Sequence, residues 1–154
     1  MKKINKIKPK ILTKVILIIT IGLFISIILF FLLFKVNRIS GESMSPTYEE
    51  DDICISFRYP KLDRFDVVMI NFNDKTYIKR IIGLPNDTIE YRNNVLYINN
   101  EEVIDNYNNG YTKDFIITLR EDEIFCIGDN REKSMDSRLL GPFKTGYVLG
   151  EVIN

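Results

Sequence analysis

The feature that most constrains this chain is a charge-free apolar run near its N-terminus. Residues 15–34 are 20 consecutive positions without a charged side chain. At about 1.5 Å per residue, a helix of this length crosses a hydrocarbon core roughly 30 Å thick. The alternatives are a buried helix of a soluble protein and a cleaved secretory signal. The run is longer than the roughly 7–15 residues of a signal's apolar region, and no small-residue cleavage pattern follows it. We therefore interpret residues 15–34 as an uncleaved transmembrane helix.

Charge is distributed unevenly around this run. Residues 1–38 hold eight basic side chains and no acidic one, and six lysines precede the run. This excess predicts a cytoplasmic tail at residues 1–14 and an extracytoplasmic domain at residues 39–154 of a single-pass protein of the cell membrane. Residues 39–154 carry 13 basic and 21 acidic side chains, a net charge of −8. Such a charge argues against nucleic acid as a partner, whereas the lipid bilayer is a partner that the apolar run implies.

The segment 39–154 has the pattern of a mainly β domain. Apolar and β-branched segments, separated by Asn, Gly and Pro, predict strands at 52–57, 67–72, 77–82, 88–91, 95–98, 123–127 and 147–153. Asn93-Asn94 and Asn99-Asn100 tolerate the positive φ that tight hairpin turns need. The polar segment 106–112 is predicted to be a loop. We expect a folded antiparallel sheet with a barrel-like arrangement, preceded by one N-terminal transmembrane helix.

Two cysteines, Cys54 and Cys126, lie in apolar surroundings within predicted strands. An extracytoplasmic location permits a disulfide between them. Their apolar neighbours favour two buried free thiols, which is the interpretation that we prefer.

Ser43 lies in a small, polar, turn-like segment, residues 41–48, shortly after the apolar run. A nucleophilic serine needs a base, and histidine, the usual base, is absent from the chain. The base would have to be a lysine, a carboxylate or the chain terminus. Lys79 is a candidate because it lies among isoleucines in a predicted strand, where burial would lower the pKa of its amine. The alternative is an ordinary strand lysine whose ammonium group reaches solvent.

The segment 128–138 is unusually dense in charged and hydroxyl side chains. These are Asp129, Arg131, Glu132, Lys133, Ser134, Asp136, Ser137 and Arg138. They are suited to buried ion pairs and to orienting another polar group, although a charged surface loop has the same composition. The acidic run 49–52 is interpreted as a solvated turn, because adjacent carboxylates point apart and no histidine joins them. We expect neither a metal nor a cofactor.

Four motifs follow the apolar run in order. They are Ser43-Met44-Ser45-Pro46-Thr47, Phe65-Asp66-Val67-Val68, Lys79-Arg80-Ile81-Ile82-Gly83-Leu84-Pro85, and Gly128-Asp129-Asn130 continuing through Ser134-Met135-Asp136-Ser137-Arg138 to Gly141. Together they resemble the boxes of type I signal peptidases (bacterial leader peptidases) over roughly residues 10–153, and the small size with a single span resembles the Gram-positive branch. The resemblance implies a serine endopeptidase that removes N-terminal signal peptides from secreted preproteins after small residues. Its implied partners are those preproteins and the secretion machinery.

The resemblance also implies a role for individual residues. Ser43 would be the nucleophile, Lys79 the general base, and Ser134 would hydrogen-bond the lysine amine. The backbone N–H of Ser43 would form part of the oxyanion hole. Gly41 stands where some family members carry a serine hydroxyl as a second oxyanion donor. Two ion pairs would brace the site: Asp129 with Arg80, and Asp136 with Arg138.

Two other functions stay open from the sequence. A non-catalytic anchored module that binds extended peptides would keep the sheet but would not need Ser43, Lys79 and Ser134 together. A specialised peptidase for one class of surface or pilus protein would share the chemistry and differ only in its substrates.

Overall fold

The computed structural model describes residues 9–108 and 110–153, and the chain divides into two units between Phe34 and Lys35. The first unit contains helix α1 (Pro9–Leu33), which is long and apolar enough to cross a membrane. Helix α1 begins before the expected start at residue 15, because Lys10 and Lys14 are good helix formers that extend it. It ends one residue earlier than expected, since Phe34 already belongs to the first strand.

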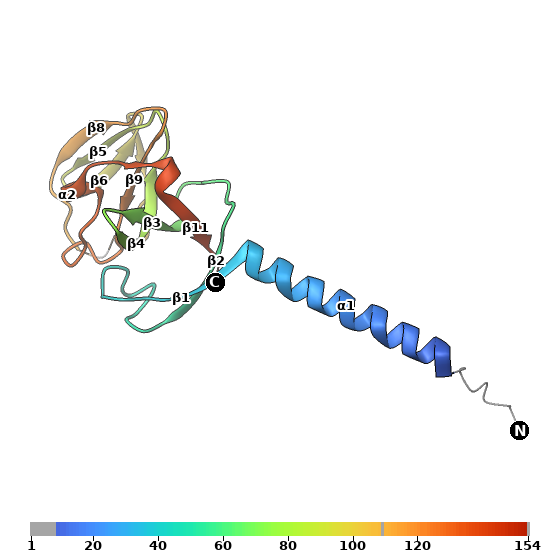
Figure 1. Ribbon diagram of the computed structural model, residues 1–154. Coiled ribbons are helices and arrows are strands. Elements are labelled where there is room, and N and C mark those ends of the chain that lie inside the picture. Colours follow the sequence, from blue (N-terminus) through green and yellow to red (C-terminus); the bar gives the residue numbers. More distant parts are fainter. Residues whose placement is uncertain (1–8, 109, 154) are drawn as a thin grey trace, which may run out of the picture. The chain divides into compact units, whose positions relative to one another are not determined.

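The second unit is built on two antiparallel sheets (Figure 1). The larger sheet has the strand order β1-β2-β11-β3-β4-β9-β10. Its strands are β1 (Phe34–Arg38), β2 (Ile53–Phe57), β3 (Val67–Phe72), β4 (Lys75–Gly83), β9 (Glu123–Ile127), β10 (Phe143–Lys144) and β11 (Val148–Val152). Strand β4 is central to the site, because it pairs with β3 along its first half and with β9 only from Arg80 onward.

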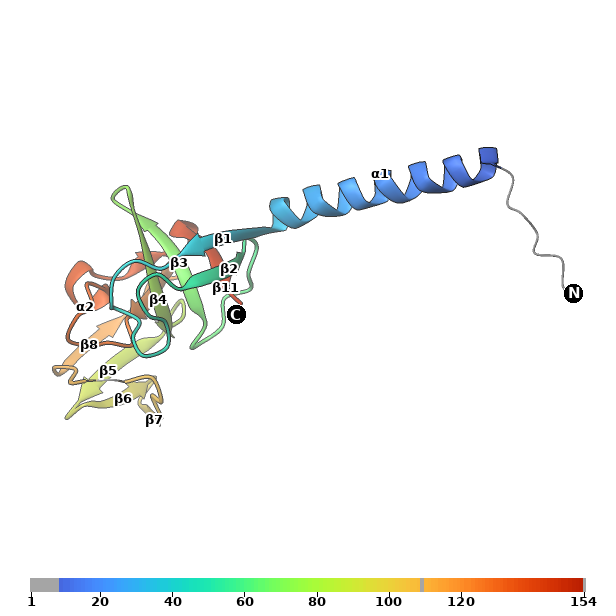
Figure 2. The ribbon, with the colours of Figure 1, turned by 90° about the horizontal axis from the view of Figure 1, so that it is seen from below.

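The smaller sheet has the order β7-β6-β5-β8 and lies at the end of the β domain away from β1 and β2 (Figure 2). Its strands are β5 (Thr88–Arg92), β6 (Val95–Ile98), β7 (Glu101–Val103) and β8 (Phe115–Thr118). Asn93-Asn94 and Asn99-Asn100 all have positive φ, between 52° and 68°, as the hairpin pattern predicts. A short helix α2 (Ser137–Leu140) and a 3₁₀ turn η1 (Thr145–Tyr147) precede the last strand.

Buried apolar side chains form three clusters. One cluster joins the two sheets, with Tyr91 and Leu96 of the smaller sheet against Phe125 and Ile127 of β9. A second cluster takes in Met44, so that the turn before β2 is fixed by its one deeply buried side chain.

The mainly β, antiparallel expectation is confirmed. All seven expected strands exist, with ends that differ by a few residues, and Cys54 and Cys126 are buried free thiols. Sequence reasoning missed β1, β7, β8, β10 and α2. Each is five residues or shorter, so the hydrophobic period is sampled too few times to give a signal.

Candidate active site

Ser43 lies in a hydrogen-bonded turn that connects β1 to β2. The amide of Ser45 donates to the carbonyl of Glu42 (3.2 Å), and the amide of Tyr48 donates to that of Met44 (3.0 Å). Because Met44 is 1% exposed while Ser43 is half-buried, the turn directs adjacent side chains into the core and into the site respectively. The backbone N–H of Ser43 donates to no other residue among those described, so it is available to a ligand.

Lys79 reaches this serine from the middle of β4. Its Nζ lies 2.7 Å from Ser43 Oγ and 2.8 Å from the carbonyl oxygen of Ile78. Lys79 is 3% exposed, and this desolvation lowers the pKa of its amine from 10.5 to about 8. The charges of Asp136 and Asp129 oppose the shift but do not cancel it. An amine whose neutral form is reached near pH 8, rather than near pH 10.5, therefore lies in contact with a serine hydroxyl.

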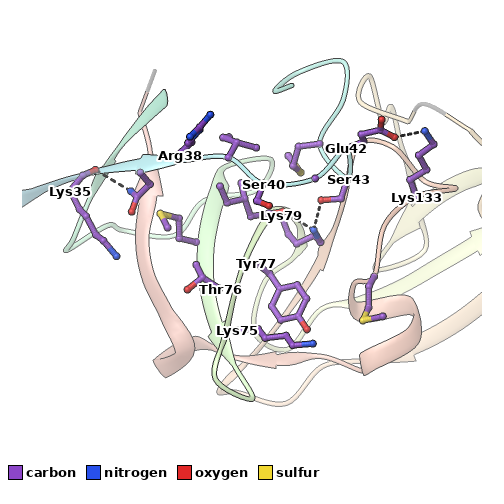
Figure 3. Close-up of a pocket in the computed structure, with 17 residues that line it drawn as sticks. Lys35, Arg38, Ser40, Glu42, Ser43, Lys75, Thr76, Tyr77, Lys79 and Lys133 are labelled. Carbon is purple, nitrogen blue, oxygen red and sulfur yellow. Dashed lines mark hydrogen bonds and ion pairs between the residues drawn. The ribbon is translucent and has the colours of Figure 1, made fainter. Parts of the chain in front are cut away.

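An open strand edge lies beside this pair. Residues 75–79 of β4 pair with β3 on one side, but in the sheets that the described residues form they have no strand on the other side. A groove of about 630 Å³ runs along this edge, with Ser43 and Lys79 in its wall (Figure 3). Unpaired main-chain groups along a groove are what an extended peptide needs in order to bind as an added strand.

Arg80, the neighbour of Lys79, points to the opposite face and is held by Asp129. Its Nε and Nη2 donate to the two carboxylate oxygens of Asp129 at 2.9 and 2.6 Å, and its Nη1 donates to the carbonyl of Phe65 at 2.8 Å. Thr47, from the serine turn, donates to the same carboxylate at 2.5 Å. One buried ion pair thus joins the lysine strand, the serine turn and the 128–138 segment.

The 128–138 segment closes the site from the other side. Asp136 is fully buried, caps α2, accepts from the amide of Gly128 (3.0 Å) and pairs with Arg138 through two contacts of 2.9 Å. The amide of Asn130 donates to the carbonyl of Ser43 at 3.1 Å. A Cβ on Gly128 would collide with that same carbonyl and with the side chain of Ser134, so only glycine permits this close approach.

Ser134 differs from its expected placement. Its hydroxyl is buried beside Gly128 and has no hydrogen-bond partner among the described residues, so the expected bond to the Lys79 amine is absent. The amine contacts Ser43 Oγ and the carbonyl of Ile78 instead. Ser134 is therefore next to the site without holding the lysine.

Gly41 has no side chain and therefore gives the site no hydroxyl at the position where a serine was considered as a second oxyanion donor. It lines the groove with a φ of +86°, and nothing lies within 4 Å of the place that a Cβ would occupy. The space would admit a side chain, but the left-handed backbone would strain one. The backbone N–H of Ser43, which has no acceptor among the described residues, is the unpaired donor next to the serine hydroxyl.

Several residues that hold the site were missed from sequence. Tyr107 and Thr112 lie in the segment 106–112 that was predicted only to be a polar loop, Asp105 lies just before it, and Tyr91 lies in β5. Their contacts with Arg80 and Arg131 are long-range, and nothing in the local sequence indicates them.

Fold and site together define a class of protein. A β domain behind one membrane-length helix, with a serine hydroxyl against a desolvated lysine and beside an open strand edge, is a membrane-anchored serine peptidase.

Comparison with known proteins gives the particular family. The family described as "Signal peptidase, peptidase S26" matches residues 12–154, and the chain belongs to it. "Signal peptidase I S" of Bacillus subtilis (strain 168) is 33% identical, with 97% of this chain and 91% of the relative covered. "Signal peptidase I" of Bacillus caldolyticus is 35% identical over 74% of each chain. The crystal structure of a signal peptidase I from Enterococcus faecalis V583 aligns with a TM-score of 0.57 and 35% identity, covering 62% of this chain and 98% of that one.

Proposed function

We propose that this chain is a signal peptidase that cleaves signal peptides from preproteins with a Ser43–Lys79 dyad. The observation that carries the proposal is the 2.7 Å contact between Lys79 Nζ and Ser43 Oγ in a chain of the signal peptidase family. The chain has no histidine that could serve as the base instead.

In the acylation step, neutral Lys79 accepts the proton of the Ser43 hydroxyl while Oγ attacks the scissile carbonyl carbon. The oxyanion that forms accepts a hydrogen bond from the backbone N–H of Ser43. The carbon–nitrogen bond then breaks, and the Lys79 ammonium returns its proton to the leaving amine. The products of this step are the free mature protein and an ester between Ser43 and the signal peptide.

In the deacylation step, Lys79 is neutral again and takes a proton from a water molecule. The hydroxide attacks the ester carbonyl, the bond to Ser43 Oγ breaks, and Lys79 gives its proton to that oxygen. The same amine thus serves as base and acid in both halves, which requires a pKa not far from the ambient pH. A pKa of about 8 meets this requirement.

The substrate would bind as an extended strand along residues 75–79 of β4. Its main chain would pair with the open edge, and alternate side chains would face the groove wall around Met69 and Ile78. Alternation explains why residues at the first and third positions before the cut would be read together, since they point the same way. A preference for small residues at these two positions follows if the groove there is shallow.

Anchoring would bring enzyme and substrate to one surface. We infer a cytoplasmic tail at residues 1–14, a transmembrane helix at 15–34 and an extracytoplasmic peptidase domain at 39–154, because the lysines precede the apolar run. A preprotein held by its own signal in the same bilayer would then have a high effective concentration at the groove. The secretion machinery, which delivers such preproteins, would be a neighbouring partner.

Replacement of the dyad tests the proposal. The full chain in detergent or vesicles should cleave a preprotein after its signal peptide, whereas Ser43→Ala and Lys79→Ala should lose at least about 10³-fold in kcat. Ser45→Ala, two residues along the same turn, is the matched control and should retain activity, since its hydroxyl hydrogen-bonds Glu49 and no other described residue. Normal processing by Ser43→Ala or by Lys79→Ala would contradict the dyad. A specialised enzyme would differ in the range of preproteins cleaved, which a comparison of mature N-termini with and without the enzyme would reveal.

A further inference from the structure

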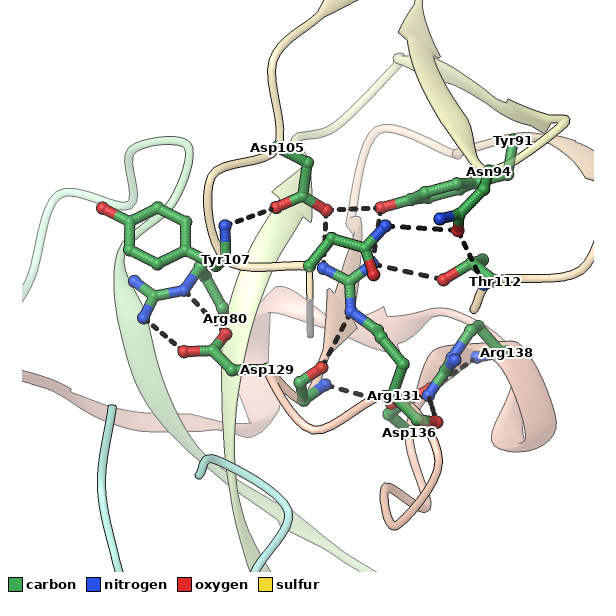
Figure 4. A network of polar contacts seen from close by, with 12 residues as sticks. Arg80, Tyr91, Asn94, Asp105, Tyr107, Thr112, Asp129, Arg131, Asp136 and Arg138 are labelled. Atoms are coloured by element: carbon green, nitrogen blue, oxygen red, sulfur yellow. Dashed lines mark hydrogen bonds and ion pairs between the residues drawn. The ribbon is translucent and has the colours of Figure 1, made fainter. Parts of the chain in front are cut away.

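The β7–β8 loop (residues 104–108 and 110–114 in the described part of the chain) contacts both arginines that border the site. Tyr107 lies with its ring centroid 3.5 Å from Cζ of Arg80 (Figure 4). Arg80 follows Lys79 in β4 and is fixed by Asp129 on its edge, so the ring stacks on a face of a guanidinium in a buried ion pair. Stacking of a guanidinium on an aromatic face stabilises both and excludes water from the pair.

Asp105 makes the second contact, with Arg131 of the 128–138 segment. The carboxylate accepts from Arg131 Nη2 at 2.5 Å and from the Tyr91 hydroxyl at 2.7 Å. Arg131 also donates to the carbonyl of Gly128 (3.0 Å) and to Thr112 (3.2 Å). The side chains of Arg131 and Asp105 are only 1% and 5% exposed, so this ion pair depends on its partners for solvation.

These two contacts act on different walls of the same site. Arg80 belongs to the strand that carries Lys79, and Arg131 belongs to the segment whose Asn130 amide holds the carbonyl of Ser43. The amide of Tyr107 donates to Asp105 at 3.1 Å, so the two contact residues are tied to each other. We propose that the β7–β8 loop, through Tyr107 and Asp105, is a positioning element that holds the serine and the lysine of the site in register.

Loosening of this element would be felt at the lysine amine. The groups that face Lys79 are Ser43 from the turn, the Tyr77 ring from β4, Cys126 from β9, and Asp129, Asp136 and Arg138 from the 128–138 segment. Of these groups, Asp129 is held by Arg80, and Arg138 donates to the backbone carbonyl of Arg131 at 2.7 Å. If the 128–138 segment loosens, water reaches the amine and weakens the desolvation that is the largest cause of its lowered pKa, so the neutral form is disfavoured, and the Ser43 carbonyl loses its fixed partner.

The matched test uses three substitutions in one loop. Tyr107→Leu removes the ring from Arg80. Tyr107→Phe keeps the ring and removes only a hydroxyl that has no hydrogen bond within the described residues. Tyr111→Leu makes the same chemical change as the first at a side chain that is 61% exposed. Tyr107 itself is 38% exposed, so we expect the leucine variant to fold.

We expect Tyr107→Leu to move the alkaline rise of kcat upward by roughly half a pH unit or more, a loss of about threefold at pH 7, with KM within about twofold of wild type. KM is spared because the open edge of β4 is not touched. Tyr107→Phe and Tyr111→Leu should match wild type. An unshifted pH profile in Tyr107→Leu, with or without a uniform loss of activity at every pH, would overturn the positioning role.

This inference rests on the proposed peptidase activity, so a second readout separates the two. Titration of the lysine ε-carbon by NMR, assigned with Lys79→Met, should give a higher pKa for Lys79 in Tyr107→Leu than in wild type or Tyr107→Phe. If wild type cleaves no preprotein, the proposed function fails, whereas the NMR titration still decides the role of the loop. An identical Lys79 titration in wild type and Tyr107→Leu would overturn the inference even if the enzyme is active.

Discussion

Lys79→Met should inactivate the protein and at the same time stabilise its fold at neutral pH. The pKa of the Lys79 amine falls from 10.5 to about 8 on folding. At roughly 1.36 kcal/mol per pKa unit, this lowers the free energy of unfolding by about 3 kcal/mol at any pH where the folded amine is protonated. Methionine has a similar length and no charge, so this cost disappears. The two lost hydrogen bonds, to Ser43 Oγ and to the Ile78 carbonyl, offset roughly 1 kcal/mol each. The net gain is about 1 kcal/mol below pH 8.

The sign follows from proton binding in the two states. Below pH 8 the amine is protonated whether the chain is folded or unfolded, and the full cost applies. Between pH 8 and 10.5 the unfolded chain binds more protons than the folded chain, so wild-type stability rises with pH in this window. Above pH 10.5 the amine is neutral in both states, the desolvation cost vanishes, and the variant differs from wild type only by its two lost hydrogen bonds. The variant should therefore be more stable than wild type at pH 7 and less stable at pH 11.

The assay is urea unfolding of the full chain in one detergent, for both proteins at a series of pH values. The chain has no tryptophan but eight tyrosines, so near-ultraviolet circular dichroism reports on the β domain. The reasoning is refuted if Lys79→Met is less stable than wild type at pH 7. It is refuted equally if the stability difference stays constant between pH 8 and 10.5.

Two further predictions concern the packing of the site. Gly128→Ala should lower kcat in the cleavage assay at least about tenfold, because the added methyl group would displace the carbonyl of Ser43. Gly146→Ala, where nothing lies within 4 Å of the added methyl group, should leave activity unchanged in the same assay. Equal activity of the two variants would contradict the close approach at Gly128. Cys54 and Cys126 should resist alkylation in the folded chain, because burial raises the pKa of both thiols, and they should react once urea unfolds the chain. Rapid labelling at pH 8 without denaturant would argue against their burial.

The central chemistry of the site was predictable from single residues and from the ordered motifs, although Ser43 and Lys79 are 36 residues apart. Lys79 lies between isoleucines in a segment of strand pattern, and a chain without histidine leaves few bases for Ser43. The prediction that Arg80 pairs with Asp129 came from the resemblance of the ordered motifs to type I signal peptidases, and neither segment alone indicated it. The geometry agrees with it, as the two fork contacts of 2.6 and 2.9 Å demonstrate.

What could not be predicted depends on contacts between distant segments. Asp105 and Arg131 are 26 residues apart, and Tyr107 meets Arg80 only because the smaller sheet folds back on the larger one. Polar loops have no periodicity that would indicate such docking. Ser134 shows the opposite error: its hydroxyl lies beside Gly128 next to the site, as expected, but it has no hydrogen-bond partner among the described residues.

The unpaired half of β4 also affects whether copies of this protein associate with one another. A strand with free amide and carbonyl groups is a template for any other extended chain, including a second copy of itself, and most proteins cover or blunt such an edge. Here the edge must stay uncovered for a peptide to enter. Its exposed first residue is Lys75, and a lysine at an edge opposes association between like copies. Charge repulsion should therefore be more important for keeping this chain from associating than for a protein whose sheets have no open edge. Because salt screens charge, association between copies should increase at high salt.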